Sequence, residues 1–311
     1  MRRTIVLLLV TLVVVPLVSY LMDAPLTDLQ WSTLRTLMAI YLTFSALTFA
    51  VSQATGNCSQ VDKLWSILPV LHVWVMADAA GYTPRALLMA GLVTLWGIRL
   101  TYNFGRRGGY SWRFWAGEED HRWGVLRRDP NLSRPWAWTL FDLFFISFYQ
   151  LGLVLLFTLP MLLVVGAPGN LGAGDILLAT LFLAFLSIET IADQQQWEFQ
   201  KEKHRRLTVG ERLDGRYALG FVHDGLWSYV RHPNYAAEQV QWTIFYGFGV
   251  LATGRPMNWS LCGVLLLVLL FQGSSDFGER ISTGKYAGYE EYRRRVPRFL
   301  PRVGDRTGLS G

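Results

Sequence analysis

Apolar residues occur along this chain in long blocks that are separated by short polar stretches. Each block is close to the roughly 20 residues that a helix needs to cross a bilayer. The blocks lie near residues 4–22, 32–52, 64–80, 86–104, 137–165, 175–197, 234–252 and 257–273. The pattern predicts an all-α, polytopic integral membrane helix bundle with about seven or eight transmembrane helices.

The composition supports this interpretation. Hydrophobic residues make up 51% of the chain and charged residues only 17%, whereas soluble domains carry about 25% charged residues. These values exclude a disordered chain and an ordinary water-soluble enzyme. Two cysteines cannot build a disulfide framework or a zinc site, and five histidines are too few for a histidine-rich di-iron oxygenase. We therefore expect no metal.

Basic residues gather on alternate loops between the apolar blocks. The loops that are poor in basic residues hold only Arg35, Arg85 and Arg255. The other basic residues lie in five segments: before the first block, at Lys63, within 105–135, within 198–233 and after residue 274. By the positive-inside rule, both termini and the two large loops are cytoplasmic. The net charge of +6 is then mostly a topology signal, and no nucleic-acid partner is expected.

The N-terminus has two interpretations. Arg2 and Arg3 before an apolar run resemble a secretory signal peptide, but residues 19–23 lack a small-x-small cleavage site, which favours an uncleaved first helix. We expect one membrane domain over residues 1–311, with N-terminal spans in residues 1–53 and polar motifs concentrated in residues 185–302.

The sixth block carries polar residues on one face. Glu189, Asp193, Gln196 and Gln200 are spaced i, i+4, i+7 and i+11, which places them together on a helix. A helix that emerges into the cytoplasm would explain Gln200. A carboxylate as deep as Glu189 needs a partner, and this favours a functional site.

The seventh block begins with Arg231-His232-Pro233-Asn234-Tyr235. Pro233 predicts a helix start at that residue, with Arg231 and His232 at its mouth. A helix N-terminus beside an arginine suits an anion or phosphate, although Arg231 binding lipid phosphate and His232 capping the helix is the alternative. Further along, a polar stripe runs inward through Asn234, Glu238 and Gln241.

Two other polar stretches are candidates. Ser59-x-x-Asp62 precedes the third block and fits either a helix cap or a catalytic acid. Arg99 lies within the fourth block and needs a partner, for which Asp62 is a candidate. Near the C-terminus, Tyr286, Tyr289 and Tyr292 suggest an interfacial helix with an aromatic edge. Dinucleotide, P-loop, zinc-protease and serine-hydrolase motifs are absent from the sequence.

Several of these residues together resemble a known family. The residues are Asp193, Gln195, Phe199, Gly225-Leu226-Trp227, Arg231 to Tyr235 with Glu238, and Glu279 with Tyr289, Tyr292 and Phe299-Leu300-Pro301. The chain is similar over residues 55–302 to bacterial membrane proteins related to steroid 5-alpha-reductase. Isoprenylcysteine carboxyl methyltransferases and sterol reductases of the lamin-B-receptor type share part of the pattern, and the segment 290–297 is close to the methyltransferase version.

The resemblance implies an NADPH-dependent enzyme of the bacterial inner membrane that reduces an enone carbon–carbon double bond, with residues 54–302 as the reductase-like region. The cofactor-binding residues it implies are Asp193, Gln196, Lys201, Arg205, Trp227, Arg231, His232, Asn234, Tyr235, Glu238, Glu279, Tyr286 and Tyr289. The Gln-Glu pair of the steroid reductases is missing here. The nearest polar groups supply the catalytic candidates Asp62, Tyr102 and Gln53 and the substrate-binding candidates Asn57, Trp65, Trp96 and Arg99.

Three functions remain open at this point. The first is NADPH-dependent reduction of a membrane-partitioned enone such as a 3-oxo-4-ene steroid, which enters from the bilayer among the membrane lipids. The second is an S-adenosylmethionine-dependent methyltransferase of the isoprenylcysteine type. The third is a transporter or lipid-binding protein, which would place polar residues through both halves of the bilayer rather than in the cytoplasmic half alone.

Overall fold

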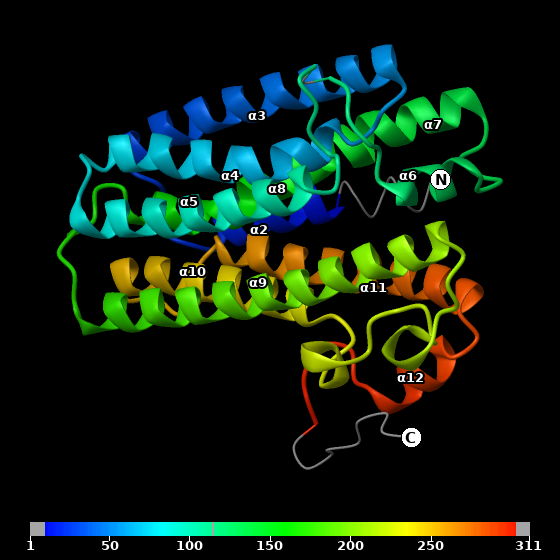
Figure 1. Ribbon diagram of the computed structural model, residues 1–311. Helices are drawn as coiled ribbons and strands as arrows, with labels where there is room; N and C mark the ends of the chain where they lie inside the picture. Colours follow the sequence, from blue (N-terminus) through cyan, green and yellow to red (C-terminus); the bar gives the residue numbers. More distant parts are fainter. Residues whose placement is uncertain (1–9, 114, 303–311) are drawn as a thin grey trace. The chain divides into compact units, whose positions relative to one another are not determined.

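The computed structural model describes residues 10–113 and 115–302 (Figure 1). Over these residues the secondary structure is entirely helical, without a strand. The elements in chain order are η1 Val10–Val14, α2 Val15–Leu21, α3 Asp28–Thr55, α4 Gln60–Ala79, α5 Pro84–Gly105, α6 His121–Arg127, α7 Pro135–Phe141, η2 Asp142–Tyr149, α8 Gln150–Thr158, η3 Leu159–Val164, α9 Ala173–Thr208, η4 Gly215–Tyr217, η5 Gly225–Ser228, α10 Pro233–Thr253, α11 Leu261–Lys285 and α12 Tyr289–Arg295.

The all-helical membrane fold is confirmed. Five segments of the described chain are long and apolar enough to cross a membrane, namely α3, α5, Pro135–Val164, α9 and α11. Helices α4 and α10 are not among the five segments. They have 20 and 21 residues, but polar residues such as Asp62 and Glu238 lower their mean hydropathy. Every predicted block overlaps a described helical segment, although residues 4–9 of the first block lie outside the described residues. The count of seven or eight spans stays a prediction.

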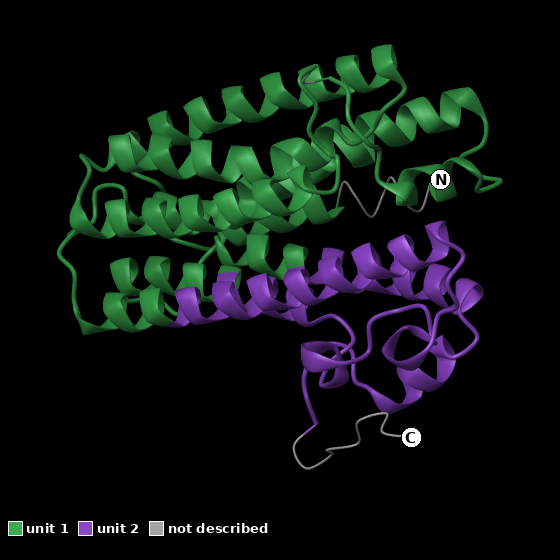
Figure 2. Ribbon diagram, viewed as in Figure 1, with its two compact units in different colours: residues 1–180, 242–267 green, residues 181–241, 268–311 purple. Residues whose placement is uncertain are grey.

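The chain forms two compact units (Figure 2). Unit 1 comprises residues 1–180 and 242–267, and unit 2 comprises residues 181–241 and 268–311. Helices α9, α10 and α11 each contribute residues to both units, so each unit is built partly from segments that are distant in the sequence.

The core of unit 1 is built by close helix packing and by aromatic side chains. Helices α4 and α5 approach closely at Gly97, where a Cβ atom would lie 2.5 Å from Cγ2 of Val70. The indoles of Trp96 and Trp242 meet edge to face with ring centroids 5.0 Å apart. Phe157 packs on Trp242 with a centroid distance of 4.1 Å. Glycine therefore allows the close helix contact, and large rings fill the remaining volume.

The predicted fifth span is an irregular helix. Residues 135–164 pass from α-helix to a π-helix at Asp142–Tyr149, back to α-helix, and then to a 3-10 helix at Leu159–Val164. Pro160 lies in the first turn of this last element, where its missing N–H is tolerated. A π-helix inside a longer helix is rare and is frequent at functional sites.

Local signals determine where the helices near the candidate sites begin and end. Thr27 and Gln30 form a reciprocal capping box that starts α3. Gly56 ends this helix at φ +68°, a conformation that suits glycine. The turn directs Asn57 and the residues after it into α4. Helix α10 begins at Pro233, as the sequence predicts.

We expect Gly263→Ala to destabilise the protein. A Cβ atom at Gly263 on α11 would overlap the backbone oxygen of Leu156 on α8, and backbone cannot move aside cheaply, so the free energy of unfolding should fall by about 1–3 kcal/mol. The matched control is Gly273→Ala on the same helix, where no heavy atom lies within 4 Å. That change should leave the thermal midpoint in detergent unchanged or raise it. Equal losses in both variants would contradict the packing.

Candidate functional site

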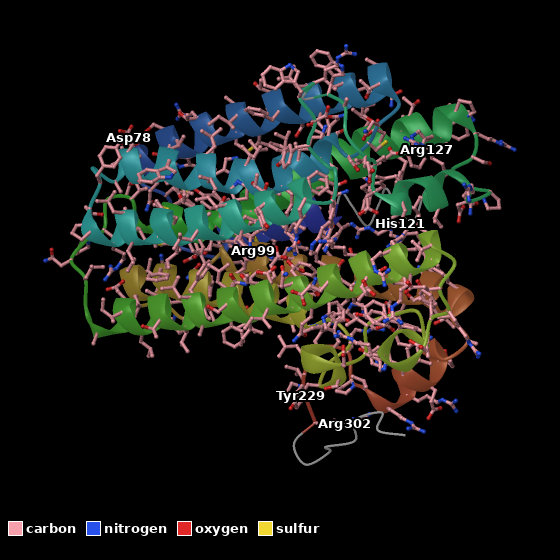
Figure 3. All side chains as sticks on the ribbon, viewed as in Figure 1. Asp78, Arg99, His121, Arg127, Tyr229 and Arg302 are labelled. Atoms are coloured by element: carbon pink, nitrogen blue, oxygen red, sulfur yellow. The ribbon has the colours of Figure 1, made fainter. Side chains whose placement is uncertain are left out.

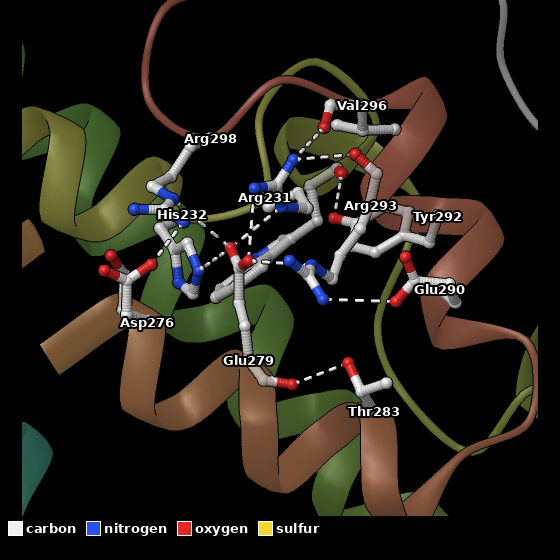
Figure 4. A network of polar contacts seen from close by, with 12 residues as sticks. Arg231, His232, Asp276, Glu279, Thr283, Glu290, Tyr292, Arg293, Val296 and Arg298 are labelled. Carbon is white, nitrogen blue, oxygen red and sulfur yellow. Dashed lines mark hydrogen bonds and ion pairs between the residues drawn. The ribbon is translucent and has the colours of Figure 1, made fainter. Parts of the chain in front are cut away.

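The buried carboxylate of Glu279 on α11 is contacted by arginine and histidine side chains of unit 2 (Figure 4). The Nε and Nη2 atoms of Arg231 donate to its two oxygens at 2.8 and 3.2 Å. The Nε2 atom of His232 lies 2.9 Å from Oε1, and the Nε atom of Arg293 lies 3.2 Å from Oε2. Because Glu279 is 1% exposed, these charge-assisted bonds compensate its desolvation.

Arg231 also fastens the chain that follows α12. We call residues 296–300 the C-terminal strap. The Nη1 atom of Arg231 donates to the backbone oxygens of Arg293, at 3.0 Å, and of Val296. The backbone N–H groups of Arg231 and His232 donate to the oxygens of Pro297 and Arg298 at 2.8 and 3.2 Å. Arg231 therefore holds protein acceptors on all three guanidinium nitrogens, and the sequence did not indicate this structural role.

The two predicted polar stripes of unit 2 face each other. We call Glu189, Asp193, Asn234, Glu238 and Gln241 the polar ladder. The Nδ2 atom of Asn234 donates to Oδ1 of Asp193 at 3.0 Å. In a second pair of the ladder, Nε2 of Gln241 donates to Oε2 of Glu189 at 2.7 Å. The three acids and Gln241 are all buried, so α9 and α10 hold between them a cluster of polar side chains that is rich in hydrogen-bond acceptors.

The Gly225-Leu226-Trp227 motif packs against α9 beside the ladder. The backbone N–H of Leu226 donates to Oε1 of Gln195 at 3.0 Å, and the indole of Trp227 donates to the oxygen of Ala192 at 3.1 Å. The hydroxyl of Tyr292 donates to the backbone oxygen of Trp227 at 2.5 Å. Trp227 thus connects α9 with α12 through hydrogen bonds within the protein.

The basic residues at the C-terminal end of α9 are paired with neighbouring acids. Arg205 binds Glu202 at 2.8 Å and Glu211 at 3.0 Å. Arg206 binds Glu202 and Asp214 at 2.9 and 2.7 Å, and its guanidinium lies 4.5 Å above the ring of Tyr217. Lys201 is exposed. A phosphate at Arg205 would have to compete with these carboxylates.

Sequence reasoning missed Lys203. Its ammonium group is buried and donates to the oxygen of Gly220 at 3.0 Å and to the hydroxyl of Tyr286 at 3.2 Å. The signal was present, because Lys203 lies 14 residues after Glu189 and continues the spacing of the polar face of α9.

The tyrosines near the C-terminus do not form an exposed aromatic edge. Helix α12 begins at Tyr289, so Tyr286 lies outside it. Tyr289 and Tyr292 are buried against Phe221, and this burial raises the pKa of Tyr289 to about 12. The prediction of an exposed aromatic edge is wrong, because the tyrosines of α12 pack inward; an interfacial position of this helix stays a prediction.

In unit 1, the segment that begins at Asn57 holds the long loop between α5 and α7. Asn57, Gln60 and Lys63 donate from their side chains to three consecutive backbone oxygens, those of Gly117 at 3.0 Å, Trp115 at 2.9 Å and Ala116 at 2.7 Å. We call these three side chains the loop clamp. Because each donor reaches a different carbonyl, the loop is held in one conformation at its middle.

Asp62 and Ser59 also contact this loop. Oδ2 of Asp62 accepts from the indole of Trp123 at 3.1 Å, and its partial burial raises the pKa of the Asp62 carboxyl. Asp62 was a candidate partner for Arg99, but its carboxyl interacts with Trp123 and Arg122 instead. Ser59 precedes α4 but makes no side-chain cap, because its Oγ accepts from the backbone N–H of Asp120 at 2.9 Å.

The other catalytic and substrate-binding candidates are spread through unit 1. Gln53 donates to Oδ2 of Asp142 at 2.7 Å. The side chain of Tyr102 is 67% exposed, whereas Trp96 is completely buried in the aromatic core. Trp65 packs on Phe157, and Arg99 projects from α5 (Figure 3).

Sequence reasoning also missed Asp142. This residue is 0% exposed and accepts from Oγ of Ser52 at 2.7 Å, from Gln53, and from Oγ of Ser147 at 3.3 Å. An acid inside an apolar block was the available signal. Asp142 fastens the start of the π-helix to α3.

We expect Glu279→Gln to release the C-terminal strap. The substitution leaves Arg231 buried without its anion, and breaking a buried pair from one side removes about 3–5 kcal/mol of stability. Hydrogen exchange should become faster at the backbone amides of Arg231 and His232, which donate to the strap, together with a lower thermal midpoint. The control is Glu290→Gln, since Glu290 is an exposed partner of Arg293 and its loss should change stability by less than about 1 kcal/mol. Unchanged exchange in Glu279→Gln would contradict the anchoring role.

Comparison with known proteins places this architecture in one family. Residues 48–296 match the family described as "Protein of unknown function (DUF1295)". An uncharacterized protein of Schizosaccharomyces pombe is 35% identical over 291 residues, which cover 89% of this chain and 82% of the relative. No solved structure matches the chain. Because the family match covers most of the helical bundle and both polar sites, the chain belongs to the DUF1295 family.

Proposed function

We propose that this protein is an NADPH-dependent membrane reductase that acts on the carbon–carbon double bond of a membrane-partitioned enone, such as a 3-oxo-4-ene steroid or a related lipid. The observation that carries the proposal is the polar ladder, above all the 3.0 Å hydrogen bond from Asn234 to Asp193. The likeness of the surrounding motifs to the steroid 5-alpha-reductases supports the same conclusion.

The ladder fits the nicotinamide end of the cofactor. A carboxamide has both donor and acceptor groups, and the ladder offers carboxylates that accept beside amides that donate. Asp193, Asn234 and Glu238 would orient it. Buried partners discriminate strongly between ligands, because a mismatched ligand leaves polar groups unpaired.

The phosphate groups of NADPH have fewer available partners in unit 2. Arg205 and Arg231 already bind carboxylates, so each would have to exchange a partner or share it. Lys201 is exposed, so it is the cation that could reach a phosphate with the least reorganisation. His232 lies at the start of α10 but already contacts Glu279 at 2.9 Å. The positive-inside pattern supports a cytoplasmic position for the phosphate groups, and a bacterial inner membrane is part of the proposal.

The chemistry requires a donor at the substrate carbonyl. The bound cofactor supplies the hydride that reaches the β-carbon. The protein has to orient the enone, exclude water and stabilise the charge that develops on the carbonyl oxygen. Asp62 is our candidate for that donor, because it is a carboxyl at the start of α4 whose burial raises its pKa, as suits a general acid.

A second candidate function is S-adenosylmethionine-dependent methyl transfer of the isoprenylcysteine type. The segment Glu290-Glu291-Tyr292-Arg293-Arg294-Arg295-Val296-Pro297 favours it. In this chain that segment forms α12 and the start of the C-terminal strap. The two functions differ first in the cofactor that is bound.

We expect NADPH to raise the thermal midpoint of the detergent-purified protein, and S-adenosylmethionine to leave it unchanged. Asn234→Ala and Glu238→Ala should each abolish the NADPH shift, because each removes a group from the ladder. The control is Asn131→Ala, since Asn131 makes a similar 3.0 Å bond to Asp129 in an exposed loop. Stabilisation by S-adenosylmethionine alone would replace the reductase with the methyltransferase. An NADPH shift that survives in both ladder variants would remove this cofactor site.

We expect Asp62→Asn to keep the NADPH shift and to lower kcat on a 3-oxo-4-ene steroid by roughly 100-fold, the usual effect of losing a general acid. Trp123→Phe breaks the same 3.1 Å hydrogen bond from the other side but keeps the carboxyl, so its kcat should change far less. Equal losses in the two variants would mean that Asp62 only positions the loop.

A further inference from the structure

The loop between α5 and α7 presents an unusual combination of side chains. We call the described residues 106–113 and 115–136 the Trp/Arg loop. Trp112 is fully exposed, and Trp115 and Trp136 are 44% and 52% exposed. Indoles are rarely left in water, since each exposes a large apolar surface.

Exposed arginines accompany these indoles. Arg107, Arg113, Arg128 and Arg134 are exposed, and none of them forms an ion pair with another described residue. By contrast, Arg122 and Arg127 of the same loop are paired with acids. Glu118 is the one exposed acid among the described residues 106–136. The outer face of the loop is therefore basic, with its positive charge uncompensated.

Side-chain hydrogen bonds to neighbouring segments hold the backbone of this loop. The loop clamp fixes the backbone oxygens of Trp115, Ala116 and Gly117. Arg127 adds two bonds to Glu119, at 2.7 and 2.9 Å, and one to the oxygen of Gly56 at 2.7 Å. These contacts hold the backbone shortly after Trp112 and Arg113, which lowers the entropy that a ligand must remove when it binds the loop.

The ligand must match an indole and an arginine side by side. Tryptophan prefers the boundary between hydrocarbon and headgroups, and arginine binds phosphate with paired donors. The loop runs directly into the membrane-crossing segments α5 and Pro135–Val164 at its two ends, so headgroups lie within its reach. We propose that the Trp/Arg loop is a binding site for anionic phospholipids of the surrounding bilayer.

The test compares the protein reconstituted in nanodiscs of phosphatidylcholine and of phosphatidylglycerol. The thermal midpoint of the wild type should be higher in phosphatidylglycerol. The double variant Trp112→Ala, Arg113→Ala should keep its midpoint in phosphatidylcholine and lose at least half of that difference. The control is Arg212→Ala, an exposed arginine of unit 2, which should keep it. An undiminished difference in the double variant would overturn the proposal.

A depth measurement gives an independent readout. The native cysteines are buried, and burial raises the pKa of the Cys58 thiol to about 11, so a nitroxide label introduced with Ser111→Cys reports on the loop alone. In phosphatidylglycerol nanodiscs the label should be relaxed by oxygen more than by a water-soluble nickel chelate. Relaxation mainly by nickel would place the loop in water, and protection from both reagents would indicate a second copy of the chain; either result would overturn the proposal.

Discussion

Unit 2 depends on the compensation of one buried carboxylate. Glu279 lies within a helix that is apolar enough to cross a membrane, where an unpaired charge would be strongly unfavourable. Arg231, His232 and Arg293 satisfy it from three sides. The same contacts set the position of the start of α10, and with it the position of Asn234 opposite Asp193. The acceptor-rich interior of unit 2 therefore follows from an ion-pair network at its edge.

Unit 1 shows the same principle with neutral partners. Asp142 has hydroxyl and amide donors around it, and the loop clamp uses side chains to satisfy backbone oxygens. Inside a bilayer, polar groups that water cannot reach must find partners within the protein. This requirement explains why a polar residue in an apolar block, such as Asp142, can mark a junction between helices.

The sequence predicted the helices well, because apolar length and a proline at position 233 are local signals. It also predicted that Asp193 and Asn234 each belong to a polar stripe, since helical spacing alone places each of them on the polar side of its helix. That the two stripes face each other follows only from the structure. It could not show that Arg231 binds Glu279, because these residues are 48 positions apart and the pairing depends on how α10 and α11 pack. Asp62 was ambiguous for the same reason, since its partner Trp123 lies in a loop whose path has no periodic signal.

The order of the chain gives the C-terminal strap a further consequence. Arg231 precedes the acceptor oxygen of Val296 by 65 residues, so during synthesis it enters the membrane region long before its partners exist. Until then its guanidinium must remain hydrated or bind a temporary anion. Completion of unit 2 thus waits for the C-terminal residues, and a chain that stops before Glu279 leaves the Arg231 guanidinium without its carboxylate.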